Sequence, residues 1–323
     1  MTRILVVLLA LTLSIAQLIA QPGERALFGR LDVAALAGTT GVGFDVAVEV
    51  NEHVSIRTGF SYMPQIKYPL FLSVSLEDGL EEVEYYDPIM KEQQNQKMAS
   101  LLETLASLTG IEADSRVDIH VVPKYFNGKL LVDWRPLSNK AWHFTAGFYA
   151  GPSHIGTAYN YAEETAFLQA LNGYNHIYDN IKNQRPVISV GDASTELTPE
   201  LTQKFLDYGR ATFYIGPQKD GEYYHTVPAE DGSIRADCYT NAFKPYLGFG
   251  YTREIGLTGR CTLSMEGGWL FWGGKPRIIT HDGVDLAHDM EYIKKETLRH
   301  LIDGVSALKG LPLLEVRVAW RVF

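Results

Sequence analysis

Apolar and polar residues alternate along several separate segments of the chain. Between residues 42 and 50 every second side chain is apolar, while Asp45 and Glu49 belong to the other set. The alternation pauses at a short polar stretch and resumes over residues 54–62. A period of two places successive side chains on opposite faces of a strand. These two segments therefore predict a β-hairpin.

The same alternation recurs along the rest of the chain, with short polar turns between alternate pairs of segments. The further segments cover residues 27–37, 130–134, 142–149, 243–251, 263–271 and 314–322. With the first hairpin they predict about eight antiparallel strands, the smallest common even number in a single-chain bacterial barrel. Ten strands are the alternative if a segment such as 210–217 joins the sheet.

The second face of the strands decides between a soluble and a membrane barrel. A soluble β-sandwich or lipocalin-like barrel also shows period two, but its apolar side chains face the core and its other face is charged. Here the second face holds Gly, Ser, Thr and Tyr with charges of both signs, as in a small polar lumen. The sequence therefore predicts an all-β fold, an antiparallel transmembrane β-barrel with its apolar face toward lipid.

Large aromatic residues lie near the ends of the predicted strands. In membrane barrels such residues form girdles at the two interfaces with water. The predicted interfacial set is Trp134, Trp142, Trp269, Trp320 and Phe323. Their placement adds to the evidence for a membrane barrel.

The connections between the predicted strands alternate between short and long. Three short connections follow every second strand, as periplasmic turns do in such barrels. The long ones, at about 64–116, 153–241 and 275–311, are predicted to be extracellular insertions, with the side of the membrane left open for a helix at about 285–308 in the third. No second autonomous domain is indicated, so we expect one barrel domain over residues 21–323.

Helical signals occur inside the long connections. Residues 88–109 carry apolar side chains at helical spacing, including Met98, Leu101, Leu102, Leu105 and Leu108. Thr198 followed by Pro199 is typical of a helix N-cap with proline in the first turn. A further helix is predicted over residues 285–308, where apolar residues fall near a 3.6-residue repeat. The insertions therefore combine helices into a cap.

The first twenty residues predict export. Arg3 precedes an apolar run, and small residues follow as far as Ala20, which is the layout of a secretory signal peptide. Removal of residues 1–20 would leave Gln21 at the N-terminus, and the expected destination is the outer membrane. No later window approaches the ~18 consecutive apolar residues of a transmembrane helix.

Charge and cysteine content narrow the possible partners. A formal net charge of −9 with dispersed basic residues argues against nucleic acid, because phosphate binding needs concentrated Lys and Arg. Two cysteines are too few for a disulfide framework or a structural zinc site. Cys238 and Cys261 are predicted at opposite ends of one hairpin, on the order of 40 Å apart at ~3.3 Å per residue, so we expect no disulfide between them.

Three segments carry a family resemblance, AGTTGVGFDVAVEVNEHVSIRTGFSY, LLVDWRPLSNKAWHFTAGFYAG and KPYLGFGYTREIG. They resemble a family of uncharacterised outer-membrane β-barrel proteins, similar in general style to OmpA-type small barrels. The resemblance covers mainly the strands and implies the fold, the outer membrane as location and lipid as neighbour. It also implies that Phe323 is the terminal aromatic recognised by the outer-membrane assembly machinery. Arg321 and Ala319 depart from the usual apolar residues before that aromatic.

Charged residues collect on the second face of the predicted strands, with six acids and seven bases. An eight-stranded barrel has an interior that side chains fill, so charges there must pair with each other or with water. A narrow ion pathway would instead favour rings of one sign. We therefore predict a structural plug built from Arg30, Asp32, Asp45, Glu49, Arg57, Lys129, Asp133, Arg135, Lys244, Glu266, Glu315, Arg317 and Arg321.

Two other clusters contain residue types found in catalytic or metal sites, but each has a simpler structural explanation. Ser153 and His154 invite comparison with outer-membrane lipid hydrolases, but neighbours in a strand point to opposite faces, and no GxSxG motif occurs. A second cluster comprises His281, Asp282, Asp285, His288 and Asp289. Side chains on one helical face there could bind a metal, but solvated acids at the start of a helix explain the cluster as well. We predict no catalytic residue, no metal site and no cofactor.

Tyrosines concentrate in the largest insertion. Amphipathic rings can bind glycans, peptides or proteins, or they can pack within the insertion itself. The set comprises Tyr159, Tyr161, Tyr174, Tyr178, Tyr208, Tyr214, Tyr223 and Tyr224. The leading hypothesis is a non-enzymatic outer-membrane barrel whose insertions are a binding or structural surface for an unknown extracellular ligand or protein. A small porin is the alternative, and a lipid hydrolase is the third.

Overall fold

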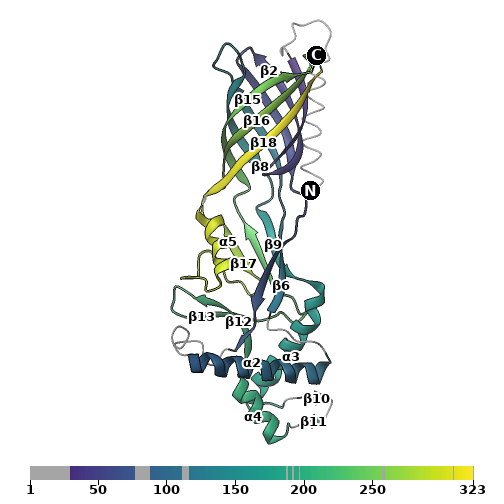
Figure 1. Cartoon of the computed structure of the whole chain (residues 1–323), viewed down its shortest axis with the longest axis vertical. Coiled ribbons are helices and arrows are strands. Elements are labelled where there is room, and N and C mark those ends of the chain that lie inside the picture. The colour runs from purple at the N-terminus through teal and green to yellow at the C-terminus, as the bar shows by residue number, and fades with distance from the viewer. Residues whose placement is uncertain are drawn as a thin grey trace.

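Eight antiparallel strands close into a barrel at one end of an elongated molecule (Figure 1). The computed structural model describes residues 30–76, 88–110, 116–186, 188–190, 193–195, 197–256, 259–307 and 309–322. The predicted signal peptide and Phe323 lie outside these residues.

The barrel confirms the predicted fold class and strand number. Its strands are β1 (Arg30–Gly38), β2 (Gly41–Asn51), β3 (Val54–Tyr62), β7 (Phe126–Trp134), β8 (Trp142–Ala150), β15 (Phe243–Ile255), β16 (Cys261–Phe271) and β18 (Gly310–Arg321). Around the wall the order is β1, β18, β16, β15, β8, β7, β3, β2, and the pairing of β2 with β1 closes the ring. Strand β12 (Ala211–Pro217) lies in a separate sheet, so the ten-stranded alternative is wrong.

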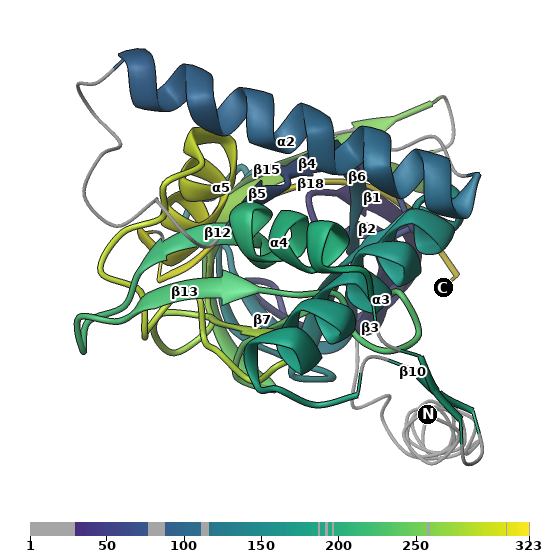
Figure 2. The same cartoon turned by 90° about the horizontal axis from the view of Figure 1, so that it is seen from below.

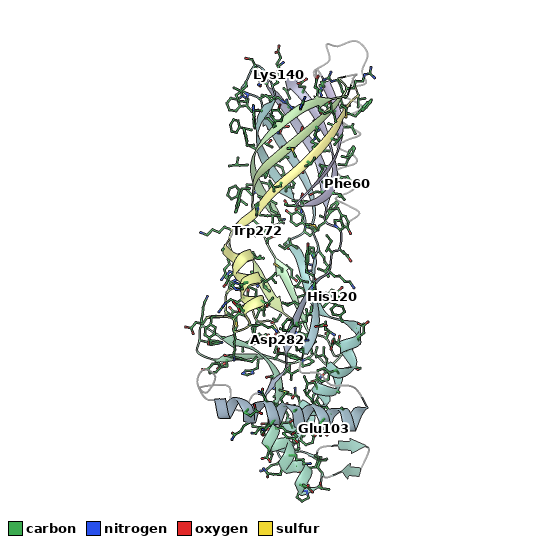
Figure 3. The ribbon with its side chains drawn as sticks, viewed as in Figure 1. Phe60, Glu103, His120, Lys140, Trp272 and Asp282 are labelled. Carbon is green, nitrogen blue, oxygen red and sulfur yellow. The ribbon has the colours of Figure 1, made fainter. Side chains whose placement is uncertain are left out.

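Side chains alternate between the outside and the inside of the barrel. Phe60 and Leu314 face outward and are 39% and 66% exposed, whereas Asp45 and Arg57 face inward and are buried. Figure 3 shows Phe60 projecting from the barrel wall. A strand that is apolar outside and polar inside suits a lipid environment, because every backbone group in a closed barrel is paired.

The described residues of the three long connections, 63–125, 151–242 and 272–309, fold together into what we call the lobe. Its larger sheet has the order β17 (Arg277–Thr280), β14 (Arg235–Tyr239), β9 (His154–Asn160), β6 (Arg116–Pro123), β4 (Tyr68–Ser73). A smaller sheet contains β13 (Tyr223–Thr226), β12 and β5 (Ser75–Leu76), and β10 (Ile188–Val190) pairs with β11 (Ala193–Thr195). Backbone hydrogen bonds from Met63 N–H to Tyr125 O and from Lys124 N–H to Ile155 O join the larger sheet to the barrel.

Helices cover the end of the lobe that lies farthest from the barrel. Helix α2 (Pro88–Thr109) and helix α4 (Pro199–Tyr208) confirm two of the predicted helices, and the Thr198 hydroxyl caps α4 by accepting a bond from Leu201 N–H at 3.3 Å. Helix α3 (Thr165–Lys182), preceded by the short 3₁₀ helix η1 (Ala162–Glu164), was not predicted. Figure 2 shows α2, α3 and α4 lying across this end. No helix among the described residues is both long and apolar enough to cross a membrane.

The third predicted helix is much shorter than expected. Helix α5 spans Glu296–Ala307, so the prediction that a helix begins near residue 285 is wrong. The backbone before α5 bonds to β12 instead, because Glu291 N–H donates to Pro217 O and Lys294 N–H donates to Ile215 O. Tertiary pairing with a strand edge therefore overrides the local helical pattern.

The lobe has a hydrophobic core of its own. Buried residues from α2, α3, α4, α5, the larger sheet and the smaller sheet meet there, including Leu101, Leu168, Phe205, Phe213 and Ile302. A second, smaller apolar cluster fills the barrel end next to the lobe and contains Tyr125, Leu131, Tyr149, Tyr246, Leu270 and Leu313. The lobe is thus a packed structure and not a set of loose loops.

Candidate functional site

The barrel interior contains most of the charged residues that the alternation places there. Eight of them are buried, namely Asp45, Arg57, Lys129, Asp133, Lys244, Glu266, Glu315 and Arg317. The other five lie nearer the short turns and are half-buried, namely Arg30, Asp32, Glu49, Arg135 and Arg321. Four acids therefore accompany four bases in the buried set.

Two ion pairs cross the full width of the lumen. Arg57 Nη2 lies 2.5 Å from Glu266 Oε2, and Lys129 Nζ lies 3.1 Å from Glu315 Oε1. Strands β3 and β16 have three strands between them in either direction around the ring, and so do β7 and β18. Each pair therefore links diametrically opposite strands, and no open path passes between the partners.

Further bonds join these pairs into one network. Asp45 accepts from Arg317 Nε at 2.8 Å and lies 3.1 Å from Lys129 Nζ, while Arg57 Nε lies 2.9 Å from Asp133. Buried ions are tolerated when each has a close partner of opposite sign. The network satisfies that condition for its four acids.

One part of the network offers metal-ligand atoms. In the part of the chain that the structure describes, Asp133, His143 and Glu266 form the one group of three whose ligand atoms lie within 4.8 Å of one another. Arg57 Nη2 already donates to Asp133 and to Glu266, and Thr145 also donates to Asp133 at 2.8 Å. Because the guanidinium supplies the positive charge between the carboxylates, we assign no metal there.

A polar vestibule opens at the short-turn end of the barrel. It has a volume of about 430 Å³, and Arg30, Glu49, Arg135 and Glu254 are among the residues that line it. Arg57 and Asp133 also line it. Beyond them the lumen holds the buried rings of Tyr149 and Tyr246. The vestibule therefore reaches the network, and these two rings occupy the lumen on the lobe side of it.

Lys244 is the exception among the buried charges. Its ammonium is fully buried at the lobe end of the barrel and donates to Asn127 Oδ1 at 3.2 Å and to Ala242 O at 3.5 Å. It also lies 5.6 Å from the centre of the Tyr125 ring. No carboxylate among the described residues forms an ion pair with it. A buried cation without an anion is costly, so Lys244 stands apart from the rest of the interior.

An apolar cavity of about 340 Å³ lies where the barrel meets the lobe. One side is the barrel rim, one is the larger lobe sheet, and one is α5. The rim supplies Thr39, Met63, Tyr125, Trp272 and Leu311, and α5 supplies Leu298, Leu301, Ile302 and Val305. Figure 3 shows Trp272 at this junction. A concave apolar pocket with a few polar groups is the usual form of a small-ligand site.

Two of the residues that line this cavity have a hydrogen-bond donor with no partner in the part of the chain that the structure describes. The Tyr125 hydroxyl and the Trp272 Nε1 are buried without a hydrogen bond, and the two residues are 6% and 5% exposed. Most buried side-chain donors in folded proteins are satisfied. Sequence reasoning did not identify these residues, because each lies just outside a strand, where the alternation carries no information about which way a side chain points.

The predicted interfacial tryptophans lie at both ends of the barrel. Trp134, Trp142 and Trp320 are exposed on the outer face near the short turns. Trp142 stacks on Phe249, with ring centres 4.9 Å apart. Trp269 is half-buried near the opposite end and pairs in register with Pro312.

The insertion tyrosines divide between packing and surface positions. Tyr174, Tyr178 and Tyr224 are buried in the lobe core, so these three are not available as a binding surface. Tyr174 donates to Gly209 O at 2.6 Å, and Tyr224 donates to Asp282 at 2.6 Å. Tyr223 is 39% exposed, and the half-buried remainder comprises Tyr159, Tyr161, Tyr208 and Tyr214. The hydrophobic stripe of α3 explains why two of the buried rings face inward.

His154 has partners other than Ser153. Its Nε2 lies 3.0 Å from Thr157 Oγ1 and 3.0 Å from Asp237 Oδ1. Arg235 Nη2 lies 2.8 Å from the same carboxylate group. The serine precedes β9 and is exposed. This arrangement orients His154 within the sheet, and the hydroxyl beside it is that of Thr157, which donates to Asp237 Oδ1 at 2.8 Å.

The acidic cluster near residue 285 is a hydrogen-bonded turn. Asp285 accepts from the N–H groups of Ile278 and Ala287, each at 3.1 Å, and its own N–H donates to Asp289 Oδ2 at 2.9 Å. His281 Nε2 lies 2.9 Å from Val227 O. The expectation of acids at a helix start is wrong here, because these residues close a turn before α5.

Comparisons with known proteins find likeness in structure only. No family model matches the sequence, and no curated protein matches it either. The chain is similar to the crystal structures of Acinetobacter baumannii CarO2 (14% identity, 91% of this chain and 99% of that one, TM-score 0.38) and CarO (13% identity, 90% and 97%, TM-score 0.37). It is also similar to the crystal structure of a major outer membrane protein from Thermus thermophilus (12% identity, 90% and 98%, TM-score 0.27).

Proposed function

We propose that the protein is an exported outer-membrane barrel that is closed to ions and that displays its lobe outside the cell as a binding module. We further propose that it has no catalytic activity. The cross-lumen ion pair between Arg57 and Glu266 carries the first part of this proposal, because it occupies the interior that a channel would need.

The outer face of the barrel supports the membrane assignment. Large apolar side chains such as Phe144, Leu247, Met265 and Val318 are exposed around the wall. A soluble protein rarely leaves so much contiguous apolar surface in water. Bacterial barrels place their short turns in the periplasm and their long connections outside. By that rule the lobe is extracellular.

The lobe supports the binding role. A purely structural connection needs only short loops, whereas this lobe has its own core and forms an apolar cavity beside the barrel rim. The hydroxyl next to His154 is that of Thr157, and it donates to Asp237 at 2.8 Å instead of to the imidazole, which favours binding over hydrolysis.

Conductance in planar lipid bilayers tests the closed barrel. We expect no stable channel steps from the purified protein, because balanced ion pairs fill the lumen. Reproducible steps would instead favour a small porin, for which the vestibule of about 430 Å³ would be the inner half of the pathway.

Export and orientation have separate tests. N-terminal sequencing of the protein from outer membranes should begin at Gln21 if the signal peptide is removed. A protease added to intact cells should cut within the lobe and leave the barrel strands intact. Cleavage at the short turns between β7 and β8 in intact cells would reverse the proposed orientation.

A further inference from the structure

We propose that the cavity between α5 and the larger lobe sheet binds a long-chain carboxylic acid, with the hydrocarbon chain in the cavity and the carboxyl group at the Tyr125 end. The inference rests on the proposed binding role of the lobe and names the class of its ligand.

The lining of the cavity fits a hydrocarbon chain. Side chains such as Leu70, Val121, Ile155, Ile302 and Leu311 supply almost all of its surface. A volume of about 340 Å³ is within the range of small-ligand pockets, roughly 300 to 1,000 Å³. Transfer of apolar surface from water into such a site is favourable in proportion to the area removed from water.

The position of the cavity gives it access to the bilayer. Met63 and Leu311 line it from the barrel rim, directly next to the apolar outer face that includes Tyr62 and Leu314. Leu301 on α5 lines it and is 42% exposed. An acid dissolved in the outer leaflet could therefore enter without crossing water over most of its length.

The two unpaired donors fit the oxygen atoms of a carboxyl group. Tyr125 and Trp272 line an otherwise apolar cavity, and the Tyr125 Oη and Trp272 Nε1 atoms are buried with no hydrogen-bond partner among the described residues. A carboxylate can accept several hydrogen bonds and donates none, so it would satisfy both donors at once. A saturated hydrocarbon alone would leave both of them unsatisfied.

The unmatched charge of Lys244 favours the carboxylate over an ester. The ammonium lies 5.6 Å from the centre of the Tyr125 ring and has no anionic partner among the described residues. An anion held at the Tyr125 hydroxyl would be attracted by this cation through a region of low dielectric constant. Asn127 and Ala242 hold Lys244 in place by hydrogen bonds.

Fluorescence quenching of Trp272 measures occupancy of the cavity. In a variant with Trp134, Trp142, Trp269 and Trp320 replaced by Phe, Trp272 is the remaining tryptophan of the barrel and lobe. The protein is reconstituted in phosphatidylcholine vesicles, and 11,12-dibromostearic acid or its methyl ester is added. We expect saturable quenching by the acid, with at least about tenfold weaker apparent binding of the ester.

Two variants separate a filled cavity from a nonspecific effect. Val305→Phe adds volume inside the cavity and should weaken apparent binding of the acid about tenfold or more. Asp303→Phe adds the same ring on the exposed face of α5 and should leave binding unchanged. Non-saturable quenching, or quenching that Val305→Phe does not alter, would overturn the site.

The carboxyl contacts have their own pair of variants. Tyr125→Phe and Lys244→Met should each reduce the preference for the acid over the ester. Tyr149→Phe removes another unpaired buried hydroxyl that does not line the cavity, and it should preserve the preference. Equal binding of acid and ester by the unmodified chain would overturn the carboxylate assignment. If the barrel shows no conductance and the lobe is external but binds no acid, this inference alone is contradicted and the proposed function stands.

Discussion

The side chain of Tyr246 lies over Gly268 on the neighbouring strand, in the space that a Cβ atom there would occupy. From this position the Tyr246 hydroxyl donates to Glu266 Oε1 at 2.7 Å. Gly248 leaves room for the same ring from its own strand. The glycines of β15 and β16 thus allow a tyrosine to lie flat inside a narrow barrel and bond to the network. Close approach, and not backbone freedom, explains why glycine is needed at these positions.

Adding a methyl group at residue 268 should therefore destabilise the barrel. We expect Gly268→Ala to reduce the free energy of unfolding by about 1 to 3 kcal/mol, because the added atom displaces Tyr246 and its bond to Glu266. Gly267→Ala is the matched control, since its Cβ would meet Leu314 Cδ2 at an ordinary 3.5 Å. Urea unfolding in lipid vesicles measures both variants, and equal effects would argue against the close approach.

Loss of the cross-lumen acid should cost more. Glu266→Ala leaves Arg57 with Asp133 as its partner but removes one of its two buried carboxylates and the acceptor of the Tyr246 hydroxyl, so we expect a loss of about 3 to 5 kcal/mol in the free energy of unfolding. Glu254→Ala is the control, because that side chain is 63% exposed and its pair with Arg321 should contribute less than about 1 kcal/mol. An unchanged midpoint for Glu266→Ala would remove Glu266 from the network.

The barrel could be predicted from the sequence because the signals for its strands and hairpins lie within short segments. Alternation shows which residues face inward, and short turns set the hairpins. Which charges meet across the lumen depends on strands on opposite sides of the ring, so the pairing of Arg57 with Glu266 has no signal in either segment. Lys244 likewise looks like any other inward charge until its neighbours are known.

The lobe was harder to predict because its strands are short and its helices compete with strand edges. Phe167, Leu171, Tyr174 and Tyr178 do follow helical spacing in α3, but the aromatic content of the segment left packing and surface binding open as alternatives. Strands β9 and β14 have only seven and five residues, too few for alternation to be decisive. The cavity arises where these elements meet the rim, so no single stretch of sequence encodes it.

Acid should loosen the turn before α5. Burial acts to raise the pKa of Asp285, but hydrogen bonds from Ile278 N–H, His288 and Ala287 N–H outweigh burial and hold the pKa below its usual value. A carboxyl whose folded pKa is depressed stabilises the fold above its unfolded pKa, ~3.9, and loses that contribution as pH falls through the folded value. Susceptibility of the lobe to an acid protease should therefore rise below about pH 4.

Replacement of the same carboxyl checks the cause. Asp285→Ala leaves the Ile278 and Ala287 N–H groups without their acceptor, and we expect it to destabilise the lobe by about 1 to 3 kcal/mol at pH 6. The variant should also show a flatter response to acid than the unmodified chain. Hydrogen exchange of the lobe amides measures both effects. A variant with the same acid response would place the titrating group elsewhere.

The two cysteines should remain unbridged and should differ in their reaction with a thiol reagent on intact cells. Cys238 lies in β14 of the lobe and Cys261 begins β16 at the short-turn end, and both are free thiols. The length of β15 separates the two cysteines along the barrel axis by roughly 40 Å at ~3.3 Å per residue. A disulfide requires Cα atoms within about 7 Å of each other. A Cys238 to Cys261 disulfide in non-reducing mass spectrometry would contradict the strand order.

The rate of modification at Cys238 should depend steeply on pH. Burial, followed by the charge of Asp285, raises the pKa of the Cys238 thiol to about 11, and the thiolate is the reactive form. A small membrane-impermeant methanethiosulfonate should therefore modify intact cells slowly near pH 7.5 and about tenfold faster per pH unit up to pH 9. Cys238→Ser should abolish the reaction, while Cys261→Ser should leave it unchanged, because the reagent does not reach the periplasmic end. Modification that persists in Cys238→Ser but disappears in Cys261→Ser would mean that the short-turn end faces outward.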